Sequence, residues 1–319
     1  MNNYKEIVVK SYSEYFNYLK NELFSLHIEN YFYGLIFISL AVFILEIVFP
    51  WRKNQPIIRK DFWLDIFYMF FNFFLLNLIV LIALSNVTLQ LFNDFLSLFK
   101  LQLASFQLLD LSLYPKVISL LIFFLVSDFI QWITHRMLHR VPFFWNFHKV
   151  HHSVKQMGFA AHLRYHWMEP LIYKSMLYIP LAIIGGFSVQ DVFIVHFFAI
   201  TIGHLNHANL GWDYGFLKYI FNNPKMHIWH HSKQMPNKYG MNFGITLSVW
   251  DYIFKTNYIP SDGRDIELGF EDDEKFPKDF IHNFIFLYIY LFYMLNRGHY
   301  PCKVVVDIRG RQIFEAGGA

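Results

Sequence analysis

The chain has 319 residues, of which 55% are hydrophobic, 21% are aromatic and only 16% are charged. Soluble globular domains carry roughly 25% charged residues, so this composition indicates a membrane protein. The net charge is +3, and no lysine and arginine run is long enough to indicate a nucleic-acid partner. The single cysteine, Cys302, excludes an intrachain disulfide and a metal site built from thiolates.

The first part of the chain contains a charged segment and two apolar runs. Residues 1–30 carry acidic and basic side chains, too many for a cleaved signal peptide, so we expect the first span to be retained. Residues 31–49 are long and apolar enough to cross about 30 Å of hydrocarbon. Residues 62–84 form the clearest predicted span, and we expect Asp65 near its start to reach the membrane interface.

The next part mixes polar and apolar patterns. Residues 85–114 alternate between the two, which predicts an amphipathic segment on the outer face of the membrane. Residues 117–133 predict a further span. Because no glycine or proline interrupts the chain before Pro142, this helix should continue beyond the bilayer through His135 and His139.

Three shorter apolar stretches follow. Residues 171–187 and 189–202 are joined by Gly185 and Gly186, which predicts a tight helical hairpin. Each is short for a full crossing, so a hairpin that re-enters the membrane is an alternative to two spans. Residues 280–295 are also apolar and short, and we expect them to lie in the interface or to pack on the body.

Lysine and arginine residues predict the orientation in the membrane, because they accumulate in cytoplasmic loops. Residues 52–60, 136–164 and 218–238 contain four, five and four of them. We therefore expect these segments, and the histidines within and beside them, to lie on the cytoplasmic face.

Ten of the 16 histidines lie in three short stretches. His135 begins an HxxxH motif, and His148 and His227 each begin an HxxHH motif. Residues three and four apart share one helix face, so each motif can direct two or three imidazoles to one point. Imidazole binds iron, zinc, copper and nickel, and eight or more exceed what one ion can use, so two ions are predicted. The alternative, interfacial histidines that contact lipid headgroups, is less consistent with three such stretches in order.

At these residues the chain resembles the fatty acid hydroxylase and sterol desaturase superfamily of membrane di-iron oxidases. The resemblance covers roughly residues 45–260 and rests on the three motifs, on Asn206-His207-Ala208-Asn209 and on residues 223–227 before the last motif. It implies an all-α, polytopic integral membrane protein in which a cytosolic helical cap over the transmembrane helices holds a histidine-rich dinuclear metal site. The implied ligands are His135, His139, His148, His151, His152, His207, His227, His230 and His231.

His204 is a candidate tenth ligand. It lies three residues before His207, whereas relatives with a paired ligand at this place use a wider gap. His162 is at least as well explained as an ordinary polar loop residue, and His196 as a packing residue within a span.

Further residues resemble parts of the family that surround the metals or the substrate. Arg164, His166 and Glu169 resemble an R-x-H-P-x-E pattern, with Trp167 in place of the proline. We interpret these three residues, together with Asn206, as neighbours of the ligands or as part of the substrate pocket.

Asp128 is a candidate partner for a ligand. It lies seven residues before His135, hence on the same helix face, where a carboxylate can orient an imidazole through its second nitrogen. A local partner such as Gln131 or Arg136 is the alternative.

The stretch at residues 223–231 resembles alkylglycerol monooxygenases and bacterial sterol-desaturase-like proteins more than hydroxylases fused to soluble domains. Arg140 departs from this pattern, because alkylglycerol monooxygenases tend to place glutamate there. The resemblance assigns residues 31–260 to a membrane catalytic domain, between an N-terminal segment (1–30) and a C-terminal tail (261–319).

The predicted activity is oxidation of a C–H bond in a lipid, sterol-like or fatty-acyl substrate with O2, by hydroxylation or desaturation, at two iron ions for which zinc can substitute. The sequence shows no GxGxxG motif, haem-binding domain or cysteine cluster. Electrons are therefore expected from a b-type cytochrome, a ferredoxin or a reductase. The alternative is a non-enzymatic membrane protein with a structural dinuclear metal site.

Overall fold

The computed structural model describes residues 2–77, 79, 82–285, 302–306 and 312–316, and most of their regular structure is helical. In this described part, three helices are long and apolar enough to cross a membrane: α2 (Tyr31–Val48), α5 (Lys116–Arg140) and α8 (Val189–His207). In length and composition they agree with the first predicted span, with the third and with the second arm of the hairpin, and α5 confirms that the third continues as a helix through His135 and His139. Large apolar side chains on their surfaces, such as Phe37 and Leu121, are exposed as lipid contact requires.

The span predicted at residues 62–84 is described only in part, because residues 78, 80 and 81 lie outside the described residues. Its described part begins with an apolar helix, α3 (Phe62–Phe70), which passes into a π-helical turn, η1 (Phe71–Leu75), and α4 begins at Ile82. Asp65 is fully buried and does not reach an interface. It pairs with Arg59 at 2.5 Å and with Arg164 at 3.2 Å, because a buried carboxylate requires charged partners.

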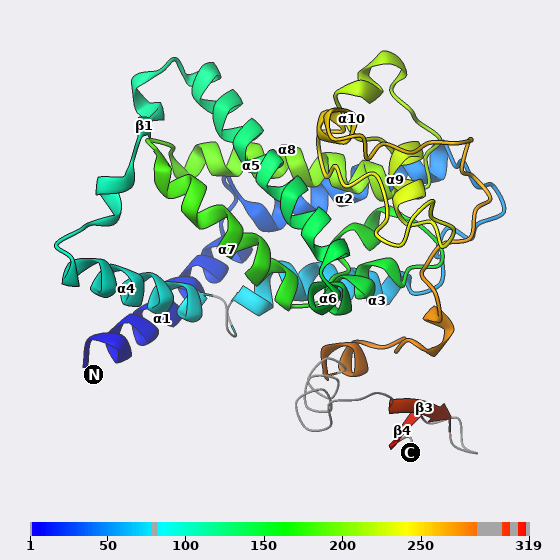
Figure 1. Cartoon of the computed structure of the whole chain (residues 1–319), viewed down its shortest axis with the longest axis horizontal. Helices are drawn as coiled ribbons and strands as arrows, with labels where there is room; N and C mark the ends of the chain where they lie inside the picture. Colours follow the sequence, from blue (N-terminus) through cyan, green and yellow to red (C-terminus); the bar gives the residue numbers. More distant parts are fainter. Residues whose placement is uncertain (1, 78, 80–81, 286–301, 307–311, 317–319) are drawn as a thin grey trace.

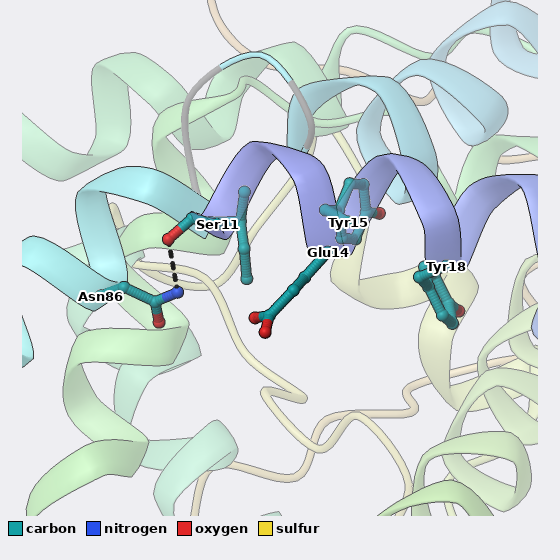
Figure 2. Close-up of a pocket in the computed structure, with 6 residues that line it drawn as sticks. Ser11, Glu14, Tyr15, Tyr18 and Asn86 are labelled. Carbon is teal, nitrogen blue, oxygen red and sulfur yellow. Dashed lines mark hydrogen bonds between the residues drawn. The ribbon is translucent and has the colours of Figure 1, made fainter. Parts of the chain in front are cut away.

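The segment predicted to be amphipathic begins with α4 (Ile82–Leu98), which packs against α1 (Asn2–Phe24) (Figure 1). A pocket of about 180 Å³ lies between the two helices, where the Asn86 amide donates to Ser11 Oγ beside Glu14, Tyr15 and Tyr18 (Figure 2). No histidine lines it. Farther along, η3 (Leu103–Phe106), β1 (Leu109–Asp110) and η4 (Leu111–Leu113) lead to α5.

The two helices of the predicted hairpin are present as α7 (Met168–Ile183) and α8, but they pack on α5 more than on each other, so the hairpin is not tight. β2 (Ile184–Gly185), at the tip of the hairpin, pairs in parallel with β1. Ser188 and Asp191 form a capping box that starts α8, and Asp191 also pairs with Lys116 at the start of α5. These contacts fix α5 and α8 side by side, so both helices carry their C-terminal histidines toward the same end of the molecule (Figure 1).

The remaining short elements gather mainly at that end. They are α6 (Pro142–His152), η5 (Phe159–Leu163), η6 (Gly215–Tyr219), α9 (Pro224–His230), α10 (Val249–Ile253) and η7 (Asp273–Lys275) (Figure 1). One antiparallel pair, β3 (Cys302–Val306) and β4 (Gln312–Ala316), departs from the all-α expectation. Of the apolar run predicted at residues 280–295, only 280–285 are described; Phe280 packs on Phe67 and Tyr68 of α3, and the rest lies outside the described residues.

Candidate metal centre

Nine histidines meet in two buried groups. Within each group, one ring nitrogen of every member lies within 4.8 Å of those of the other members. The first group, called the five-histidine group below, contains His135, His139, His148, His152 and His230. The second, the four-histidine group, contains His151, His207, His227 and His231.

The helical period divides each HxxHH motif between the groups. In α6, His148 and His152 are four residues apart and share one face, so both enter the five-histidine group, whereas His151 enters the other. The motif at α9 has the reverse assignment: His227 and His231 enter the four-histidine group and His230 the five-histidine group. α6 and α9 therefore each contribute to both groups.

The ring nitrogens are arranged as metal ligands are. Nε2 of His135 lies 3.0 Å from Nε2 of His148, and Nε2 of His207 lies 3.0 Å from Nε2 of His227. Ligands about 2.0–2.1 Å from one ion lie roughly 3 Å apart, so these spacings suit neighbouring ligands. Nε2 of His139, His152 and His230 are buried with no hydrogen-bond partner among the described residues. Unpaired buried nitrogens that face one another fit a cation between them.

Backbone carbonyls orient many of the rings. His135 Nδ1 donates to Phe243 O and His230 Nδ1 donates to Met241 O, each at 2.8 Å. In the four-histidine group, His151 Nδ1 donates to Arg164 O at 3.1 Å and His207 Nδ1 to Gly203 O at 2.8 Å. A proton held on Nδ1 leaves the lone pair on Nε2 toward the centre of the group.

Glu169 is the carboxylate that supports a ligand. Its Oε2 lies 2.8 Å from His148 Nδ1, and its Oε1 accepts from the backbone of His166. Burial raises the pKa of Glu169 to about 8 and lowers the pKa of His148 well below its usual range. A nearby cation would favour the ionised carboxylate, which accepts a hydrogen bond from His148 Nδ1.

Burial also acts on the other rings outside the candidate spans. It lowers the pKa of His151, His152, His227, His230 and His231 well below the usual histidine value, and neighbouring imidazoles lower it further. Neutral rings keep the lone pairs that ligation needs, so this environment is suited to metal binding.

The predicted tenth ligand lies outside both groups. His204 Nδ1 is 2.8 Å from Nδ1 of His162, and its Nε2 is 3.1 Å from Oγ of Ser39. With both ring nitrogens turned to these partners, neither faces the four-histidine group. His204 and His207 are three residues apart, so they share a general side of α8, but His204 points toward α2 and η5.

Comparison with known proteins agrees with this geometry. Residues 120–256 match the model of the fatty acid hydroxylase family, and all nine histidines lie within that range. Over residues 120–256 the chain is therefore similar to fatty acid hydroxylases. The resemblance noted from the motifs is thereby confirmed.

Curated relatives match less than half of the chain. An ornithine lipid hydroxylase, OlsE, from Rhizobium tropici is 29% identical over 49% of this chain and 46% of its own length. Human alkylglycerol monooxygenase is 34% identical over 42% of this chain and 29% of its own. The very-long-chain aldehyde decarbonylase GL1-10 of Oryza sativa subsp. japonica is 28% identical over 46% of this chain and 48% of its own. The chain thus spans less than half the length of each, and no solved structure matches it.

Within residues 120–256, Asp128 is not the predicted partner of a candidate ligand. Its Oδ2 accepts from Trp250 Nε1 at 2.8 Å, and neither Gln131 nor Arg136 is its hydrogen-bond partner in the structure. His135 points instead to the carbonyl of Phe243. Asp128 and His135 do share a helix face. Seven residues place them two turns apart, about 10 Å along the helix axis, which is too far for a direct hydrogen bond.

The other predicted neighbours support the domain in different ways. Arg164 supplies its carbonyl to His151, while its guanidinium is buried on Asp65. Asn206 donates to the carbonyl of Ile245 at 2.9 Å. His166 packs on Phe147 and does not belong to either histidine group.

Asp251 and Asn242 support the site in a way that no spacing rule predicted. Asp251 accepts from the backbone N–H groups of Phe243 and Gly244, at 2.9 and 2.7 Å, and from Trp132 Nε1 and Thr256 Oγ1. Asn242 donates to the carbonyls of Met226 and Tyr258. Both fix the 241–244 segment, whose carbonyls orient His135 and His230. In the sequence, the Asn242-Phe243-Gly244 and Trp250-Asp251 stretches also resemble the family, and this resemblance is the signal that could have found both residues.

Proposed function

We propose that this chain is a membrane-embedded di-iron oxidase that uses O2 to oxidise a C–H bond of a lipid. The observation that carries the proposal is the pair of adjacent, buried groups built only from histidine. Neutral ligands leave two bound cations at full charge, unlike a carboxylate-bridged pair, and the apolar helices beneath bring lipid tails close. The named relatives include two lipid oxygenases, which favours this function over a structural metal site.

We assign one ion to each group, with iron as the native metal and zinc as a possible substitute. Two bound iron ions would supply the activation of O2 and the oxidation of the C–H bond. The protein holds the rings in one tautomer through the carbonyls of Phe243, Met241, Arg164 and Gly203, and through Glu169. The near-complete burial of all nine histidines keeps bulk water out.

The substrate class follows from the setting and the relatives. We propose a lipid with a polar headgroup, held with its tail between the apolar helices and its oxidised carbon at the histidine groups. Hydroxylation would convert R–H, O2, two electrons and two protons into R–OH and water. The electrons would come from an external b-type cytochrome, ferredoxin or reductase.

We further propose a multi-pass topology with both histidine groups on the cytoplasmic face. The two crossings by α5 and α8 end in histidines at the same end of the molecule (Figure 1). The basic segments at residues 136–164 and 218–238 lie in the same region of the fold, in agreement with the positive-inside rule.

Comparative lipidomics tests the proposal. Cells that express the intact chain are compared with cells that express His151→Ala and with cells that lack the gene. A product heavier by one oxygen, present only with the intact chain, supports hydroxylation, and a product lighter by two hydrogens supports desaturation. Purified protein should contain two iron ions per chain. Identical lipid profiles in all three strains, despite full metal loading, would overturn the oxidase and favour a structural metal site.

A further inference from the structure

Of the nine grouped histidines, His139 lies nearest to the surface. It is 8% exposed, more than any of the other eight. Gly240, at φ +78°, covers its ring: a Cβ on Gly240 would lie 3.1 Å from His139 Nδ1. The next residue outward, Tyr239, is exposed on the surface. One backbone residue therefore separates the surface from the five-histidine group.

Trp145, a half-buried residue, also contacts the five-histidine group. Its half-buried ring lies 5.1 Å from the ring of His139 and 5.3 Å from that of His152. Its ring also lies 5.9 Å from that of Phe270, which is half-buried as well. Aromatic contacts thus connect the five-histidine group with half-buried rings outside it.

Basic side chains lie near His139 and Tyr239. Arg140 ends α5 next to His139, and its guanidinium lies 5.5 Å from the ring centre of Tyr239. The ammonium of Lys238 lies 4.9 Å from the same ring, and both cations are exposed. Arg136, one turn before Arg140, lies over Trp132. We call Arg136, Arg140, Lys238 and Tyr239 the basic patch.

Arg136, Arg140 and Lys238 form no ion pair with any residue in the described part of the chain. The buried carboxylate of Asp251 acts on Arg136 only from beyond ion-pair distance. By contrast Lys233, in the same loop, faces Glu267, Asp273 and Glu274 at 3.3 to 3.8 Å. Unpaired surface cations next to a short route to a redox centre attract an anionic partner and orient its approach.

We propose that the basic patch is the docking surface of an acidic electron-transfer protein, and that electrons enter the five-histidine group through Gly240 and His139. The inference rests on the proposed function, since only an oxidase of this kind consumes electrons at each turnover. The donor gives one electron at a time, and two are needed for each O2. Anionic lipid headgroups are the other class of partner that such cations could bind, and the experiment separates the two.

The test uses the full chain in nanodiscs of neutral phosphatidylcholine and measures the reoxidation of two acidic donors, a [2Fe–2S] ferredoxin and a soluble b-type cytochrome domain. The double variant Arg140→Glu/Lys238→Glu should lower the rate with the accepted donor about tenfold at low salt, and the difference should vanish at high salt. The control Lys278→Glu reverses an exposed lysine that contributes to neither histidine group, and it should leave the rate unchanged.

Light-reduced deazariboflavin, an uncharged reductant, provides the second arm. The double variant should match the wild type with this reductant, because its metal groups are intact. Equal rates for wild type and double variant with the acidic donors would overturn the proposal, as would a wild type that accepts neither donor. A rate difference that appears only in nanodiscs with anionic phosphatidylglycerol would assign the patch to lipid. If the deazaflavin-reduced wild type forms no product from any lipid, the proposed function fails instead.

Discussion

The two histidine groups differ in number and in support. The five-histidine group takes ligands from α5, α6 and α9 and rests on Glu169 and the 241–244 segment. The four-histidine group takes its members from α6, α8 and the end of α9, and the histidine pair His162 and His204 lies beside it. Both groups are buried, and the four-histidine group has fewer nitrogens to occupy the coordination positions of an ion. Under the proposed function, an open coordination position at the four-histidine group would admit O2 and substrate.

Removal of one histidine from each group tests most directly whether the two groups hold their ions differently. We expect His231→Ala to lose the ion of the four-histidine group, because only three nitrogens remain, and to abolish lipid oxidation. His230→Ala leaves four nitrogens in its group, so it should retain more metal but still lose activity. Iron per chain, measured by mass spectrometry, and product formation check this. Retention of both ions and of turnover in either variant would contradict the ligand assignment.

Glu169 should matter only to the five-histidine group. Glu169→Ala removes the acceptor for His148 Nδ1, and loss of such a support typically lowers metal affinity about 10- to 100-fold. Glu169→Gln keeps a hydrogen-bonding oxygen and should lose less. Competition with a chelator measures the two affinities separately. A fall in the affinity of the four-histidine group instead would show that the groups are not independently supported.

Asp251 stabilises the 241–244 segment, whose carbonyls orient His135 and His230 of the five-histidine group. Asp251→Asn replaces one acceptor oxygen by an N–H group that faces the donors of Phe243 or Gly244, which should cost about 1–3 kcal/mol of unfolding free energy. The orientation of His135 should be disturbed as well, since Phe243 supplies its acceptor. Thermal unfolding and metal content measure these effects. Asp128→Asn, another buried carboxylate in contact with a tryptophan, is the control that should leave metal content unchanged.

The smallest effect is expected at His204. Because both of its nitrogens face His162 and Ser39, His204→Ala should retain two ions per chain and lose stability rather than metal. Metal analysis together with thermal unfolding distinguishes the two results. Loss of one ion in this variant would restore His204 as a tenth ligand.

The sequence alone predicted what depends on local spacing. The apolar runs at α2, α5 and α8 have the length and composition of spans, and these follow from a helix rise of 1.5 Å per residue. The motifs at His135, His148 and His227 predicted metal binding, because residues three and four apart share a helix face. Glu169 was also found from its place in a family-like stretch.

Only the tertiary structure decided how these parts combine. It divided the motifs of α6 and α9 between two groups, turned His204 toward Ser39, and gave His135 the carbonyl of Phe243 in place of Asp128. It also buried Asp65 between two arginines instead of leaving it at an interface. The physical reason is that the deciding partners are distant in the chain, and many are backbone carbonyls. Every residue carries a carbonyl, so the residue types in the sequence do not show which carbonyl will accept a hydrogen bond from a given imidazole.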